Sequence, residues 1–85
     1  MNLKTKIIKA KTVRIEEIYP GQLRQIGQTL IGRCPLHDDR NPSFVVYPAT
    51  NSWYCFTEGR GGDVISLLRE LYNLEFKEAV ERLTP

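Results

Sequence analysis

Cys34-Pro-Leu-His37 begins the stretch of sequence that decides the fold, which continues to Trp53-Tyr-Cys55-Phe and Thr57-Glu-Gly-Arg-Gly-Gly-Asp63. Cys34 and His37 are three positions apart, a spacing at which a tight turn directs a sulfur and an imidazole at one point. Cys55 would be the first residue of a second pair of metal ligands. A complete four-ligand zinc ribbon would have another Cys or His at position 58, where this chain has Glu58.

These donors suit zinc, which takes four ligands in a tetrahedron from Cys thiolate, His imidazole or, less often, carboxylate. A set of two thiolates, a neutral His and the carboxylate of Glu58 gives the same net charge around Zn²⁺ as three thiolates and a His. The Glu side chain is longer than Cys by two bonds, so its backbone must lie further back. The sequence predicts a Zn²⁺ cofactor held by Cys34, His37, Cys55 and Glu58. Other candidates for the fourth position are water, Asp38 and Asp39. A metal-free fold, in which Cys34 and Cys55 are small buried residues, is the alternative.

The same residues resemble a known family. The patterns Cys34-Pro-x-His37-x-x-x-x-Pro42-Ser-Phe44 and Tyr54-Cys55-Phe56-x-x-Gly59-x-Gly61-Gly62-Asp63-x-Ile65 are similar to the N-terminal zinc-binding domain of bacterial-type DNA primases. The resemblance extends to Asn73-Leu74 and to the segment 78–83, and it covers residues 13–83. It implies a zinc ribbon that contacts the single-stranded template and assists start-site selection. It also implies that the family's fourth ligand, a Cys, falls on Glu58, and that catalysis belongs to a separate acidic, metal-dependent polymerase domain.

Periodicity predicts an α+β fold, a zinc-ribbon-like small antiparallel β-sheet with one N-terminal and two C-terminal flanking helices. Apolar residues predict a short helix that ends at Tyr19, before the turn signal Pro20-Gly21, and amphipathic helices over 64–72 and 76–83. Strands are expected over 28–33, 43–47 and 53–56, with a loop or short strand over 22–27. Gly59, Gly61 and Gly62 are expected in a permissive loop, with Asp63 as the N-cap of the next helix.

Length and charge set the remaining expectations. The 85 residues make one domain, in which we expect a basic N-terminal arm (1–12, a flexible arm or a helix extension) and a primase-type ribbon domain (13–85). Residues 1–33 hold seven basic and two acidic residues, whereas 34–85 hold five basic and eight acidic ones. This division suits either a face for a polyanion or a solvated tail with ordinary surface charge. The chain has no apolar run long enough for a membrane span and no signal-peptide pattern, so a cytoplasmic protein with reduced Cys residues is expected.

Basic side chains and aromatic rings on a small sheet are typical of proteins that bind single strands. The predicted nucleic-acid contacts are Arg24, Arg33, Arg40, Tyr47, Trp53 and Arg60. Strand alternation places Trp53 and Cys55 on one face and Tyr54 and Phe56 on the other. Phe44, Phe56 and Tyr54 are expected in the core. A Gly-rich loop before a helix can bind phosphate, but helix capping and close packing explain Gly59, Gly61 and Gly62 better.

We therefore expect a single-stranded DNA (template) binding module of a DNA primase, which assists primer initiation in DNA replication. The expected partners are the template and a catalytic primase domain or other replication protein of the primosome, with no membrane. No catalytic residues are assigned, so the domain alone is not expected to be an enzyme, whereas a larger chain or complex would be a nucleotidyltransferase. The alternative is a degenerate ribbon whose helices at 63–83 dock a primase, helicase or replication initiator.

Overall fold

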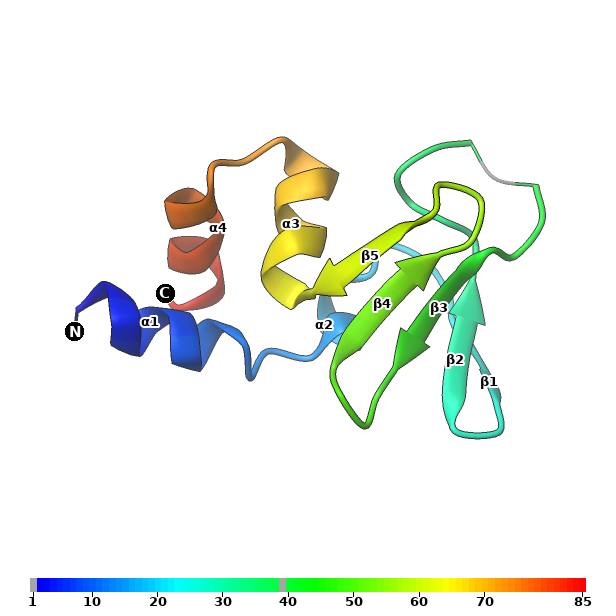
Figure 1. Cartoon of the computed structure of the whole chain (residues 1–85), viewed down its shortest axis with the longest axis horizontal. Coiled ribbons are helices and arrows are strands. Elements are labelled where there is room, and N and C mark those ends of the chain that lie inside the picture. The colour runs from blue at the N-terminus through cyan, green and yellow to red at the C-terminus, as the bar shows by residue number, and fades with distance from the viewer. Residues whose placement is uncertain (1, 39) are drawn as a thin grey trace.

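The computed structural model describes residues 2–38 and 40–85, which form four helices and five strands (Figure 1). In chain order these are α1 (Leu3–Ala10), α2 (Ile15–Ile18), β1 (Arg24–Ile26), β2 (Thr29–Gly32), β3 (Phe44–Tyr47), β4 (Ser52–Cys55), β5 (Arg60–Asp63), α3 (Val64–Tyr72) and α4 (Phe76–Leu83). The predicted α+β fold is confirmed, and the segment 22–27, left open between loop and strand, contains β1. Asp39, one candidate for the fourth ligand, lies outside the described residues.

The five strands form one antiparallel sheet in the order β1-β2-β3-β4-β5, so that each strand pairs with the next along the chain. Residues opposite each other on paired strands share a face. The outer face carries the row Arg24, Ile31, Val45, Tyr54 and Gly61. The inner face carries Phe44, Val46, Trp53 and Cys55, all of which are buried. The predicted alternation of Trp53 and Cys55 against Tyr54 is therefore confirmed.

The glycine-rich segment is a strand, which corrects the predicted loop. Residues 60–63 pair with β4, and this pairing places Gly61 beside Tyr54 and Gly62 beside Trp53. A Cβ at Gly61 would collide with the Trp53 carbonyl oxygen, and one at Gly62 would collide with the Ser66 hydroxyl. The glycines thus permit close packing of β5 on β4 and α3, as the packing interpretation predicted.

Helix α3 joins the sheet to the other helices. The Asp63 carboxylate accepts a hydrogen bond from the Ser66 N–H at 2.9 Å, so the predicted N-cap is confirmed. Asn73 ends the helix in the left-handed conformation (φ 53°). The inward face of α3 buries Val64, Ile65, Leu67 and Leu68, and the helix contacts β4, β5, α2 and α4. Phe44 lies between the rings of Tyr19 and Trp53, with centroids 5.3 and 5.5 Å away, which ties the inner face to the helices.

The basic N-terminal segment contains helix α1, which contacts α4 at the far end of the molecule from β1 and β2 (Figure 1). Asn2 caps the helix by accepting a hydrogen bond from the Thr5 N–H at 2.9 Å. Ala10, in the last turn, is completely buried, so this end of the segment belongs to the core. The division at residue 12 stays a prediction. Within the described ranges, no helix has the length and apolar character needed to cross a membrane.

Candidate metal centre

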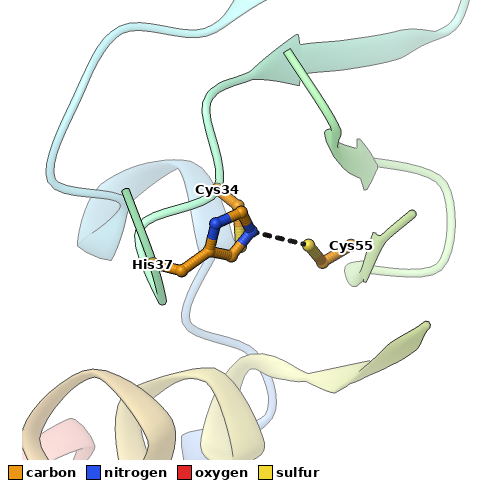
Figure 2. Close-up of side chains that lie close together, drawn as sticks. All are labelled: Cys34, His37 and Cys55. Carbon is orange, nitrogen blue, oxygen red and sulfur yellow. Dashed lines mark hydrogen bonds between the residues drawn. The ribbon is translucent and has the colours of Figure 1, made fainter. Parts of the chain in front are cut away.

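Three side chains from two separate parts of the chain meet at one end of the sheet, as Figure 2 shows. The metal-ligating atoms of Cys34, His37 and Cys55 all lie within 4.8 Å of one another. The Cys55 sulfur is 3.7 Å from Nε2 of His37. Tetrahedral zinc with bonds of about 2.3 Å to sulfur and about 2.0 Å to nitrogen places these two atoms roughly 3.6 Å apart. The separation of Cys55 and His37 therefore matches a shared zinc ion, and Cys34 is close enough to serve as a third ligand.

The sheet sets these positions. Cys34 follows the end of β2 and His37 lies in the turn after it, whereas Cys55 is the last residue of β4. Cys55 pairs with Phe44 on the inner face, so its sulfur points to the same side as the buried rings. Cys34 and Cys55 are almost completely buried, and His37 is half-buried. The backbone thus places both sulfurs at the same end of the sheet.

A second contact fixes the orientation of the His37 ring. Its Nδ1 lies 3.3 Å from the Asp38 carbonyl oxygen, which can only accept a hydrogen bond. The neutral, metal-binding form of the ring therefore carries its proton on Nδ1 and presents the Nε2 lone pair to a metal, whereas the protonated ring donates from Nε2 to the Cys55 sulfur. Metal-binding histidines commonly donate their other ring N–H to a carbonyl or carboxylate in this way.

The surroundings shift the pKa values of two of the three groups. Burial raises the pKa of the Cys55 thiol, but four hydrogen-bonding groups outweigh it, so the net pKa lies below the ordinary value. These groups are Cys34, the Glu58 N–H, His37 and Ser43. The pKa of His37 is raised, mainly by its hydrogen bond with Cys55, against a smaller lowering by desolvation. The site therefore favours a thiolate at Cys55, the form that binds metal.

Glu58 begins beside the cluster, but its carboxylate lies elsewhere. The Glu58 N–H donates to the Cys55 sulfur at 3.4 Å, within a turn that Gly59 closes by donating to the Cys55 carbonyl at 2.8 Å. The Glu58 carboxylate instead pairs with Arg60 at 3.0 Å. Among the described residues, the cluster therefore consists of Cys34, His37 and Cys55, and Glu58 as the fourth ligand stays a prediction.

The structure places the predicted nucleic-acid contacts in three different environments: buried, paired with carboxylates, and accessible. Trp53 is only 3% exposed, and its Nε1 donates to the Asp63 carbonyl and the Ser66 hydroxyl, so the prediction of a base-stacking Trp53 is wrong. The ring fills the core because Trp53 shares the inner face with Cys55. Arg60 lies between two carboxylates, those of Glu58 and Glu70. The other predicted contacts, Arg24, Arg33, Arg40 and Tyr47, are exposed or half-buried.

Of the aromatic residues expected in the core, Phe56 is exposed and Tyr54 is half-buried on the outer face. Phe56 is 63% exposed, and its ring contacts that of Tyr54 edge-on with centroids 4.9 Å apart. The available signal was the alternation along β4, because a buried Cys55 places its neighbours on the opposite face. Glu70 was also missed. Its ion pair with Arg60 joins residues of two different elements, and sequence spacing does not encode such a contact.

Comparison with known proteins agrees with this geometry. A family model described as the CHC2 zinc finger matches residues 3–85. A DNA primase of Thermotoga maritima is 43% identical over 61 residues, which are 72% of this chain and 11% of the relative. A DNA primase of Synechococcus elongatus is 47% identical over 58 residues, covering 68% of this chain and 8% of the relative. This chain thus spans about a tenth of the length of these relatives.

A solved structure of the Aquifex aeolicus primase, containing its zinc-binding and RNA polymerase domains, superposes on 92% of this chain and 20% of that chain. The TM-score is 0.81 and the sequence identity is 28%. The fold, the clustered Cys-His-Cys donors and the match over nearly the whole sequence lead to one conclusion. The chain belongs to the CHC2 zinc-finger family, the family of the zinc-binding domain of bacterial DNA primases.

Proposed function

We propose that the protein is a zinc-stabilised module that binds single-stranded DNA template for a primase. Cys34, His37 and Cys55 would hold the zinc, with Glu58 as the fourth ligand, and the metal would fix the turns at one end of the sheet. The single observation that carries the DNA-binding proposal is the outer face of the sheet, where aromatic rings and basic side chains are accessible together.

One exposed ring and two half-buried rings on the outer face support base stacking. Tyr54 lies in the central row of this face, and Phe56 contacts it from the adjoining turn. The Phe56 side chain is 63% exposed, so it adds little buried apolar area to the core of the domain. Stacking of a base on an aromatic ring contributes about 1–3 kcal/mol and tolerates any sequence. Tyr54, Phe56 and the half-buried Tyr47 are therefore the proposed stacking residues.

A basic groove is lined in part by β1 and β2 of the same sheet. It has a volume of about 730 Å³, and Arg24, Ile31, Arg33 and Pro42 are among the residues that line it. None of the described residues that line it is acidic. Two guanidinium groups on a groove that no described acidic residue lines favour a polyanion such as the DNA backbone. We include the exposed Arg40 in the proposed phosphate contacts and leave out Arg60, because two carboxylates already bind it.

Nucleotidyl transfer is assigned to another domain or protein. The proposed partner is a catalytic primase domain, which would extend the primer on the template that this module holds. This assignment is supported by the relatives, which are named DNA primases and are roughly ten times longer than the chain.

The test is fluorescence anisotropy with a labelled single-stranded oligonucleotide and the zinc-loaded protein. We expect saturable binding that weakens as salt rises. Phe56→Ala should weaken binding about tenfold, the lower part of the range for lost stacking. Arg33→Ala should weaken binding and lower the slope of log K against log salt by about 0.7, the loss of one phosphate contact on a single strand.

Arg82→Ala is the matched control, because it removes the same charge from an exposed position on α4. Circular dichroism should show an unchanged fold for all three variants. Unchanged binding by folded Phe56→Ala and Arg33→Ala would remove the outer face from the proposal. Loss of binding by Arg82→Ala to the same extent would show only a general charge effect.

A second candidate function, docking to a replication protein, is favoured by exposed apolar side chains on the helices. Tyr72 and Phe76, at the junction of α3 and α4, are 53% and 39% exposed. Ile8 on α1 is 62% exposed. This candidate predicts no saturable binding to the oligonucleotide, so the same titration distinguishes the two functions.

A further inference from the structure

The Glu58 carboxylate has two candidate cationic partners, the proposed metal and Arg60, and in the structure it pairs with Arg60. Its Oε1 is 3.0 Å from Nη2 of Arg60. The other arm of the same guanidinium, Nη1, is 3.0 Å from the Glu70 carboxylate on α3. Arg60 thus bridges two carboxylates, one from the turn after β4 and one from a helix.

We infer that Arg60 is a positioning residue of the metal centre, which competes with the metal for Glu58 and makes Glu58 an exchangeable fourth ligand. The inference rests on the metal site of the proposed function. Its geometric basis is the backbone of Glu58, whose N–H donates to the Cys55 sulfur at 3.4 Å. The side chain therefore starts at the edge of the cluster, and its direction decides whether the carboxylate reaches the metal or Arg60.

The strength of the ion pair makes such an exchange feasible. The side chains of Arg60 and Glu58 are 45% and 33% exposed, and ion pairs at this exposure change an equilibrium constant by up to about fivefold. Release of Glu58 leaves the guanidinium paired with Glu70, so no charge loses its last partner. The competition therefore weakens metal binding by a small factor and does not prevent it.

Arg60 also belongs to the metal centre by its place in the sheet. It pairs with Cys55 across β4 and β5, so both residues lie on the same side of the sheet. The outer face, with Tyr54 in its central row, is on the opposite side. A role beside the metal ligands explains the two carboxylates around Arg60, whereas a role in binding phosphate does not.

The test is a double-mutant cycle on metal affinity, with Glu58→Gln, Arg60→Gln and the double variant. Zn²⁺ and Co²⁺ affinities would be measured by competition with a chromophoric chelator. Arg60→Gln should bind metal up to about fivefold more tightly, because the freed carboxylate no longer has a competitor. Glu58→Gln should bind at least about tenfold more weakly. In the Glu58→Gln background, Arg60→Gln should have no effect.

The visible spectrum of the Co²⁺-substituted protein gives a readout that a change in stability would not produce. Glu58→Gln should change the ligand-field bands, since a carboxylate oxygen leaves the metal, whereas Arg60→Gln should keep them. Arg60→Lys keeps the charge but loses the planar fork, so its affinity should lie between wild type and Arg60→Gln. Arg82→Gln on α4 is the control for loss of one positive charge and should match wild type.

Two results would overturn the inference: an equal effect of Arg60→Gln in both backgrounds, or unchanged affinity and spectrum in Glu58→Gln. In either case, tight metal binding by the wild type would leave the proposed metal site in place. A folded wild type that binds neither ion would overturn the metal site itself, and the inference with it.

Discussion

The ligand residues Cys55 and His37 have pKa shifts in opposite directions, and each shift affects metal binding. Burial raises the pKa of Cys55, but the hydrogen bonds that its sulfur accepts lower it by more. The hydrogen bond with Cys55 raises the pKa of His37 above 6.5. Zinc binds the thiolate and the neutral imidazole, so the first shift favours metal binding and the second opposes it.

We predict that zinc affinity falls as pH falls from about 8 to about 6, because the pKa of His37 is raised above the ordinary value of about 6.5. The sign follows from His37, which binds a proton at a higher pH than an ordinary histidine and must release it to bind zinc. Cys55 acts in the same direction, since its thiol must also lose a proton to bind zinc, but its lowered pKa moves that loss to a lower pH than in an ordinary cysteine. Chelator-competition titrations at several pH values, with proton release followed in weak buffer, measure this. A constant affinity over the interval would contradict the assignment of His37 as a ligand.

At the scale of elements, one side chain joins the β3–β4 turn to the N-terminal helices. Asn51 lies in this turn with φ 50°. Its Oδ1 accepts a hydrogen bond from the Ile15 N–H, at the start of α2, at 3.0 Å. Its Nδ2 donates to the carbonyls of Lys11 and Val13 at 3.1 and 2.8 Å. These bonds fix the linker between α1 and α2 to the sheet.

Asn51→Gly should therefore lower the free energy of unfolding by about 1–3 kcal/mol, because partly buried backbone groups lose their partners while the backbone conformation stays accessible. Asn73→Gly is the matched control, since Asn73 has a similar φ of 53° but its conformation serves only to end α3. That change should alter stability by less than about 0.5 kcal/mol. Urea unfolding of the zinc-loaded variants gives both values. Equal losses in the two variants would show that backbone conformation, not the three hydrogen bonds, accounts for the effect.

Helices α3 and α4 were predictable because each buries a single stripe, and the periodicity of that stripe is visible in the sequence. The ligands Cys34, His37 and Cys55 were predictable from their spacing. Strand β5 was not, since Gly61 and Gly62 carry no side-chain pattern and become a strand only by pairing with β4. The position of the Glu58 carboxylate was also beyond sequence reasoning, because Arg60 and Glu70, which hold it there, come together only in the folded chain.

The molecule is elongated, with extents of 40 × 26 × 19 Å, so that it has two distinct ends along its longest axis (Figure 1). The sheet and its turns carry the metal ligands at one end, and α1 packs against α4 at the other. A single core cluster connects the ends and includes Cys34 and Cys55 as well as Ala79 and Val80 of α4. Because the proposed metal ligands lie at one end, loss of the metal would act directly on that end only.

Hydrogen exchange after chelation tests this division. We predict that removal of zinc greatly lowers amide protection in the turns that present the proposed ligands, residues 33–38, 40–43 and 55–59, because the metal adds direct bonds to the long side-chain contacts of Cys55 with His37 and Ser43, at 3.7 and 3.8 Å, that join these turns. Protection in α3 and α4 should fall much less, since their apolar contacts with each other and with α1 involve no ligand. Addition of zinc should restore the turns, and magnesium, which prefers oxygen ligands, should not. A uniform loss of protection would contradict local stabilisation. It would mean that this small core does not hold the helices without the metal, and that zinc binding and folding are a single event.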